Sequence, residues 1–216
     1  MASTTPPAPA RRPYAPRLPA AERREQLVEA ALDIALERGF HAVSVDAVAR
    51  ACGVTRPVVY GLFEDRTALL TALADRAEER SLAQLAGVFP ALEDLPADAD
   101  PDELLVAGVT AYLSAVAEDP RTWRVVLLPP EGAPAEIAGR VDQHRRVLLR
   151  QLRALLTWGL ERRGGPGLDP DLFARAVFTL AEGAARLILA DPGRWRLEAF
   201  QDFARTALSA LQRDPA

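Results

Sequence analysis

The stretch VDAVARACGVTRPVVYGLF, residues 45–63, decides the fold of this chain, because it predicts two short helices around a glycine turn. Ser44 can cap the first helix, and Gly53 can end it in a backbone conformation that other residues avoid. This is the outline of a DNA-reading element. It contains only two basic residues, Arg50 and Arg56, in a chain whose formal net charge is -4. If such a segment binds DNA, most of the binding energy must come from other groups.

The second helix of this pair has the features of a helix that enters the major groove. Thr55 or Arg56 caps it, since Pro57 is accepted only in the first turn of a helix. Val59 and Phe63 fall on one face and provide the apolar underside that the unit requires. A hydroxyl and a guanidinium at the start of the helix can bond phosphates or guanine. A plain helical hairpin within a core is the alternative for so short a pattern.

Composition limits the class of protein. The 216 residues, with 49% hydrophobic content, can bury a sizeable core. No run approaches the roughly 18 apolar residues of a membrane span, and the N-terminus lacks an apolar signal core, so we expect a cytoplasmic protein with no membrane partner. The single cysteine, Cys52, excludes an intramolecular disulfide and a cysteine cluster for zinc. We expect neither a metal nor a cofactor.

Positive charge is concentrated at the N-terminal end of the chain. Residues 1–24 carry five arginines against one glutamate, whereas the rest of the chain is acidic overall. Residues 1–19 contain six prolines, and we expect a disordered arm there. Affinity for DNA depends on local neutralisation of phosphates rather than on net charge. A basic arm can therefore assist an acidic body in binding DNA.

The apolar pattern after the arm is helical. A first helix is predicted from Ala20 to Arg38, with Gly39 as its stop. Asp65 caps a fourth helix that ends near Phe89. A loop over 90–102 is followed by helical patterns at 102–118, 120–128, 134–163, 170–190 and 196–211.

No strand alternation is convincing, so the predicted fold is all-α, with an N-terminal three-helix unit joined through the fourth helix to a C-terminal helical bundle. We assign residues 1–19 to the arm, 20–66 to a helix-turn-helix DNA-binding domain, and 67–216 to a domain for ligand binding and dimerisation.

The segment RREQLVEAALDIALERGFHAVSVDAVARACGVTRPVVYGLFEDRTALL, residues 23–70, resembles the N-terminal domain of the TetR (tetracycline repressor) family of bacterial regulators. The matching motifs are the Gly-Phe turn after the first helix, the Val-Ser-Val entry to the second, and Ala-x-x-x-Gly-Val-Thr at the turn. Val-Tyr-x-x-Phe and the Asp-basic-x-x-Leu start of the fourth helix follow them. The C-terminal bundle varies widely in that family, so its length and helix content add less.

The resemblance implies phosphate contacts at four of these positions. Ser44 and Thr55 stand where hydroxyls at helix starts donate to phosphates. Tyr60 occupies the position of another phosphate contact. Arg66 replaces the lysine that the family usually places on the DNA backbone, at the start of the fourth helix. Helix N-termini add attraction through their free N–H groups.

Base reading is implied for the start of the third helix. Arg56 and Pro57 match the residues nearest the bases, and Val58 points outward, where it could touch a thymine methyl group. Gly61 and Leu62 depart from the family, which often has polar or basic residues there. Their loss removes phosphate contacts, so affinity would depend more on the arm or on Arg66.

The bundle is implied to pair subunits and to sense a ligand. Two apolar faces near the C-terminus would meet their symmetry mates in a homodimer. The residues assigned to this interface are Phe173, Val177, Leu180, Ala184, Leu187, Phe200, Phe203 and Leu208. An intramolecular core is the alternative for each of them.

A ligand pocket combines apolar walls with few polar anchors. The candidates for this site are the aromatic residues Phe89, Tyr112, Trp123 and Trp158 together with the polar His144. Aromatic residues at helical spacing are more often part of a plain core. The sequence does not identify the ligand.

The function expected from these residues is transcription regulation by a homodimeric repressor, which a small-molecule effector releases from a palindromic DNA operator. The alternative is a helical small-molecule-binding protein or an enzyme with a vestigial DNA-binding head. Against an enzyme, the two histidines lie far apart in the sequence, and GGPG at 164–167 lacks the ending of a phosphate loop.

Overall fold

The computed structural model describes residues 18–88, 90, 92–127, 135–163 and 167–211, with the backbone alone over 135–144. Its elements are α1 (Ala20–Arg38), η1 (Phe40–Ala42), α2 (Val45–Ala51), α3 (Arg56–Tyr60), α4 (Arg66–Leu85), η2 (Leu92–Asp94), α5 (Pro101–Glu118), α6 (Pro120–Leu127), α7 (Ala135–Arg163), α8 (Pro170–Ala190) and α9 (Leu197–Ala210). Over these ranges no strand is present, and the predicted all-α fold is confirmed. Residues 1–17 of the predicted arm lie outside the described residues.

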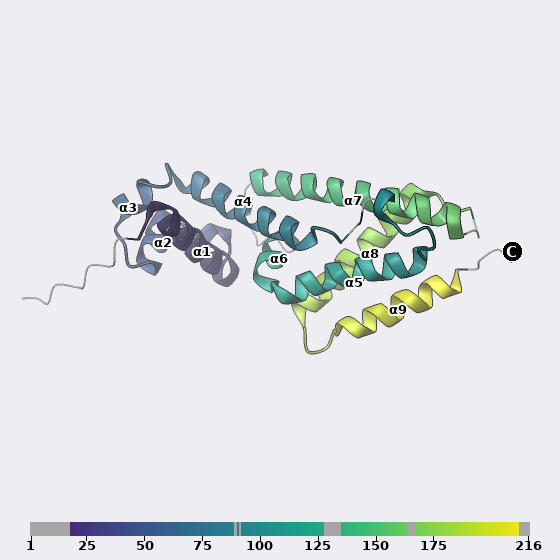
Figure 1. The fold of residues 1–216 in the computed structure, drawn as a ribbon. Helices are drawn as coiled ribbons and strands as arrows, with labels where there is room; N and C mark the ends of the chain where they lie inside the picture. Colours follow the sequence, from purple (N-terminus) through teal and green to yellow (C-terminus); the bar gives the residue numbers. More distant parts are fainter. Residues whose placement is uncertain (1–17, 89, 91, 128–134, 164–166, 212–216) are drawn as a thin grey trace, which may run out of the picture.

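Figure 1 shows two ends of an elongated molecule. Helices α1 to α3 lie together at one end, α5 and α7 to α9 form the bundle at the other, and α4 runs from the first group toward the second. Helix α6 lies between the bundle and α1 and contacts α4 as well.

Local signals define the N-terminal elements. The Ser44 side chain accepts a hydrogen bond of 3.1 Å from the Ala47 N–H and caps α2, as predicted. Asp65 caps α4 in the same way, with 2.7 Å between its Oδ1 and the nitrogen of Ala68. Gly53 has a φ of 65°, a backbone conformation that residues with a side chain rarely adopt. This turn directs the chain toward α3.

The end of α4 differs from the prediction. The helix was expected to continue to the neighbourhood of Phe89, but it ends at Leu85. Gly87 takes a φ of 84° two residues later, which no α-helix contains. Apolar periodicity continues past the helix end and therefore overestimates its length. Phe89 itself lies outside the described residues.

One apolar core extends from the N-terminal helices into the bundle. Leu27 and Phe40, both fully buried, belong to the same cluster as Leu69 on α4 and Trp123 on α6. Leu189 of α8 is also part of this cluster. The domain boundary at residue 66 remains a prediction. Helix α4, which begins there, packs against α1 as well as against helices of the bundle.

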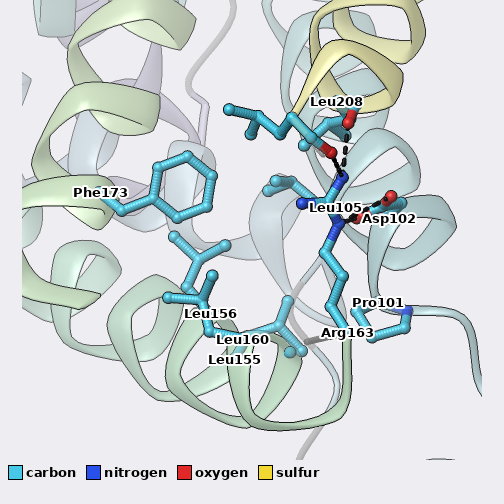
Figure 2. Close-up of a pocket in the computed structure, with 11 residues that line it drawn as sticks. Pro101, Asp102, Leu105, Leu155, Leu156, Leu160, Arg163, Phe173 and Leu208 are labelled. Carbon is cyan, nitrogen blue, oxygen red and sulfur yellow. Dashed lines mark hydrogen bonds and ion pairs between the residues drawn. The ribbon is translucent and has the colours of Figure 1, made fainter. Parts of the chain in front are cut away.

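A second, smaller core closes the far end of the bundle (Figure 2). Arg163, at the end of α7, donates from Nη2 to the carbonyl oxygens of Leu208 (2.5 Å) and Leu211 (2.9 Å). Its Nε lies 2.8 Å from an oxygen of Asp102 in the first turn of α5. The guanidinium therefore joins the ends of α5, α7 and α9, and it satisfies carbonyls that the end of α9 leaves open.

Of the helices in the described ranges, none is long and apolar enough to cross a membrane.

Candidate nucleic-acid interface

The helix α3 presents a polar start above an apolar underside. Val59 is fully buried and Phe63 is 3% exposed, which confirms the predicted underside. Thr55, at the N-cap position, makes no side-chain capping bond, so its hydroxyl is not used by the helix end. The other predicted contact residues on this helix are all exposed: Arg56, Pro57, Val58 and Tyr60.

Ser44 lies at the other helix start of the unit. Its oxygen accepts the capping hydrogen bond from Ala47, while the hydroxyl proton can still be donated to a phosphate. The side chain is only half-buried. Capping and phosphate binding are therefore compatible at this residue.

Arg56 forms an ion pair that the sequence did not indicate. Its Nε and Nη2 donate to the two carboxylate oxygens of Asp46, which lies in the first turn of α2. Both side chains remain exposed, at 62% for Arg56 and 45% for Asp46. Ten residues and a turn separate the two, so no local spacing rule connects them.

Arg66 is engaged within the protein as well. Its Nε donates to the carbonyl of Val43 and its Nη2 to the carbonyl of Phe40, each at 2.7 Å. These bonds join the start of α4 to η1 and to the residue before Ser44. A lysine at this position would offer a point charge without the planar pair of donors. Arg66 therefore has a structural contact in addition to the phosphate contact that the resemblance implies.

The departures at Gly61 and Leu62 have different surroundings. Gly61 is the C-cap of α3, and a Cβ added there would meet only the backbone of α3, at 3.4 Å or more. Leu62 is half-buried and packs against the core. Gly61 is thus an exposed position without a contact group, and Leu62 contributes to packing.

In the bundle, an apolar cavity of ≈ 30 Å³ lies between α5, α7 and α8. Tyr112 lines it, and the Tyr112 ring meets Trp123 edge to face at 5.5 Å. Trp123 is buried and donates from its indole nitrogen to Gln84 of α4, at 2.8 Å. Trp158 lies under the guanidinium of Arg162 and does not line this cavity.

Phe89 and the side chain of His144 lie outside the described residues, so their assignment to the pocket remains a prediction.

A charged pair borders the cavity. Glu182, which lines it, is 8% exposed and accepts two hydrogen bonds of 2.6 Å from Arg145 of α7. Burial raises the pKa of the Tyr112 hydroxyl far above its usual value, and the negative charge of Glu182 adds to this rise. Tyr112 is therefore a neutral hydrogen-bonding group at the cavity wall.

The residues predicted at the dimer interface divide into two sets. Leu180, Leu187 and Phe203 are exposed, at 64%, 39% and 63%. The other five, Phe173, Val177, Ala184, Phe200 and Leu208, are buried or packed against the cores of the subunit itself. Leu172, 69% exposed on α8, was missed by the sequence analysis.

Comparison with known proteins identifies relatives of this chain. The family described as "Bacterial regulatory proteins, tetR family" matches residues 27–73. The HTH-type transcriptional activator FasR of Mycolicibacterium smegmatis is 30% identical over 125 residues, which span 58% of this chain and only 54% of that relative. The HTH-type transcriptional regulator EthR of the same species is 30% identical over 175 residues, or 80% of this chain and 78% of EthR.

A solved structure, the transcriptional regulator FadR from Bacillus subtilis in complex with stearoyl-CoA, has a similar fold. Its TM-score is 0.65 at 20% identity, covering 88% of this chain and 99% of that one. FasR and EthR are both transcriptional regulators, which agrees with the predicted class and not with the enzyme considered as an alternative.

Replacing Arg66 with alanine is expected to lower the free energy of unfolding by about 2 kcal/mol, because the carbonyls of Phe40 and Val43 each lose a charged donor. Arg66→Lys is expected to recover only part of this loss. Chemical unfolding of the full chain measures both. Arg50→Ala, which removes an exposed arginine from the same unit, is the control. Equal stability of Arg66→Ala and Arg50→Ala would contradict the structural contact.

Proposed function

This chain belongs to the tetR family of bacterial regulatory proteins, and we propose that it is a homodimeric repressor which a small-molecule effector releases from a palindromic operator. The observation that carries the proposal is the exposed polar start of α3 above its buried underside, since this is what a major-groove helix requires. Such a protein would act in the cytoplasm, where bacterial DNA is found.

The contacts proposed for one subunit are few. The hydroxyls of Thr55 and Ser44 would donate hydrogen bonds to phosphates, and the phenolic hydroxyl of the exposed Tyr60 would donate another. Arg56 would face the bases, with Pro57 and Val58 beside it. Arg66 would bring its positive charge to the DNA backbone while it bonds carbonyls of its own chain. Helices α1 to α3 form the DNA-reading unit of a subunit, here called the reading head. With so few contacts in each subunit, two reading heads on one DNA would be needed for useful affinity.

The exposed leucines of α8 support the proposed dimer. Leu172, Leu180 and Leu187 follow one another at intervals of eight and seven residues, which places them on one stripe of the helix. A stripe of leucine side chains that are 39% to 69% exposed is typical of an interaction surface. A second copy of the chain suits it, because a two-fold axis would pair the stripe with itself and space two α3 helices along the DNA.

The apolar cavity supports an effector with a large apolar part. Its walls are almost entirely leucine, valine, phenylalanine and tyrosine carbon, with Glu182 as the charged exception. At ≈ 30 Å³ it holds about one or two water molecules, so a larger ligand would have to separate α5, α7 and α8. We therefore infer a fatty acyl compound, which is also the kind of ligand bound in the solved FadR structure.

A contact route connects this cavity to the reading head. Tyr112 meets Trp123 of α6, which bonds Gln84 of α4. Arg121, also on α6, forms ion pairs with Glu29 and Asp33 of α1. Displacement of the cavity wall would thus reach both α4 and α1, and a state with a different head spacing would be favoured by ligand.

Footprinting of the full chain on the DNA upstream of its own gene tests the proposal. We expect protection of a palindromic site, with affinity that falls as salt rises. Arg56→Ala should weaken this binding by about 1 to 3 kcal/mol and relax base preference, whereas Arg175→Ala, an exposed arginine of α8, should not. In vitro transcription then distinguishes repression from activation. If no DNA site is protected even at low salt, the regulator proposal is wrong.

A charge on the α8 stripe should dissociate the dimer. Sedimentation equilibrium is expected to give the mass of a dimer for the wild type and that of a monomer for Leu180→Glu, because a carboxylate would be buried between two copies. Leu82→Glu, at an exposed leucine of α4, is the matched control. A dimeric Leu180→Glu variant would place the interface elsewhere.

Thermal unfolding with acyl-CoAs of increasing chain length tests the effector class. The unfolding temperature should rise with chain length, since a ligand of the native state stabilises it. Ala181→Leu adds a side chain at the cavity wall and should abolish the rise, whereas the exposed Ala83→Leu should keep it. A rise of equal size in Ala181→Leu would exclude this cavity as the site.

A further inference from the structure

We propose that Asp46 is a specificity-determining residue, whose carboxylate holds Arg56 in the orientation that reads a guanine in the major groove. The inference rests on the proposed function, which supplies the DNA. It concerns a residue for which neither the sequence pattern nor the resemblance implied a role in recognition.

The geometry of the pair supports this role. Asp46 accepts hydrogen bonds from one edge of the Arg56 guanidinium: Nε donates to Oδ1 and Nη2 donates to Oδ2. A guanidinium has five N–H donors, and the end formed by Nη1 and the second N–H of Nη2 is left for another acceptor. Guanine presents two acceptors, O6 and N7, that match such a pair of parallel donors. One arginine can therefore bond the carboxylate along one edge and the base along the other.

Arg56 is placed where such a contact can occur. It is the first residue of α3, and 62% of its side chain is exposed despite the ion pair. Residues at the start of a recognition helix are those that contact base edges. Asp46 belongs to a different helix, α2, which packs against α3, and Val48 of α2 and Val59 of α3 are buried in the same core. The carboxylate thus fixes the arginine relative to the whole unit.

Orientation before binding matters because a free arginine has many rotamers and two competing targets on DNA. Restricting the side chain in advance reduces the entropy lost on binding. The carboxylate also disfavours the competing phosphate contact, since Arg56 would have to leave Asp46 unneutralised beside the negatively charged backbone. Both effects direct the same guanidinium toward a base. An exposed pair of this kind contributes little to folding stability, so recognition rather than stability is its measurable effect.

Selection of DNA from random duplexes by the full chain, followed by sequencing, tests the inference. The wild type should enrich a site with guanine at one position of each half, and Arg56→Ala should lose the preference at that position. Asp46→Asn should lower the preference for guanine there by roughly tenfold and leave the other positions unchanged. Asp46→Glu, which keeps the charge, should recover part of the preference. In an Arg56→Ala background, Asp46→Asn should have no further effect on it.

Asp171→Asn is the matched control, because it removes the same charge from an exposed aspartate that pairs with Arg175, far from the reading head. Thermal unfolding of each variant verifies that it is folded. If Asp46→Asn keeps the guanine preference and binds all sequences more tightly, Asp46 only repels DNA and the inference is wrong. If the wild type selects a site but Arg56→Ala loses no base preference, the inference fails and the regulator function stands. If the wild type enriches no sequence, the proposed function fails.

Discussion

The structure depends on α4 being packed at both of its ends. Near its start, Leu69, Leu70 and Leu73 are buried in the core that contains Phe40. Near its end, Leu85 enters the wall of the bundle cavity. Because packed interiors resist deformation, neither end of this helix can shift without carrying its neighbours along. Helix α4 therefore couples the packing of α1 to the packing of the bundle around its apolar cavity.

Directional polar contacts define how these packed parts are aligned. Apolar burial is not directional, so it leaves the rotation and sliding of helices weakly specified. Asp119, just before α6, accepts hydrogen bonds from Thr122 and from Gln84 of α4. Burial acts to raise its pKa, but the bonds from Thr122, the positive charge of Arg80 and the bond from Gln84 together hold the pKa below its usual value. Arg76 pairs with Glu25 and with another acid of α1. Such contacts join α4 and α6 to each other and α4 to α1.

The sequence predicted the features that depend on local spacing. The caps at Ser44 and Asp65 act across three residues, and the underside at Val59 follows the helical period, so both can be recognised without a structure. The partners of Arg56 and Arg66 could not be predicted, because tertiary packing alone brings them within reach across ten and more than twenty residues. The same limit applies to the apolar residues of α8 and α9, where the helical period identifies a face but not what covers it.

The weak charge of the reading head now has a physical interpretation. Residues 44–66 contain three arginines and three acids, and two of those arginines have acceptors within the chain. Few cations mean few released counterions, and hence weak binding to DNA of arbitrary sequence. Contacts to bases do not depend on this term. Since a regulator competes against a great excess of non-specific sites, the ratio of specific to non-specific affinity matters more than affinity alone. If Arg56 is held toward a base as proposed, the sparse charge raises this ratio by lowering the non-specific affinity.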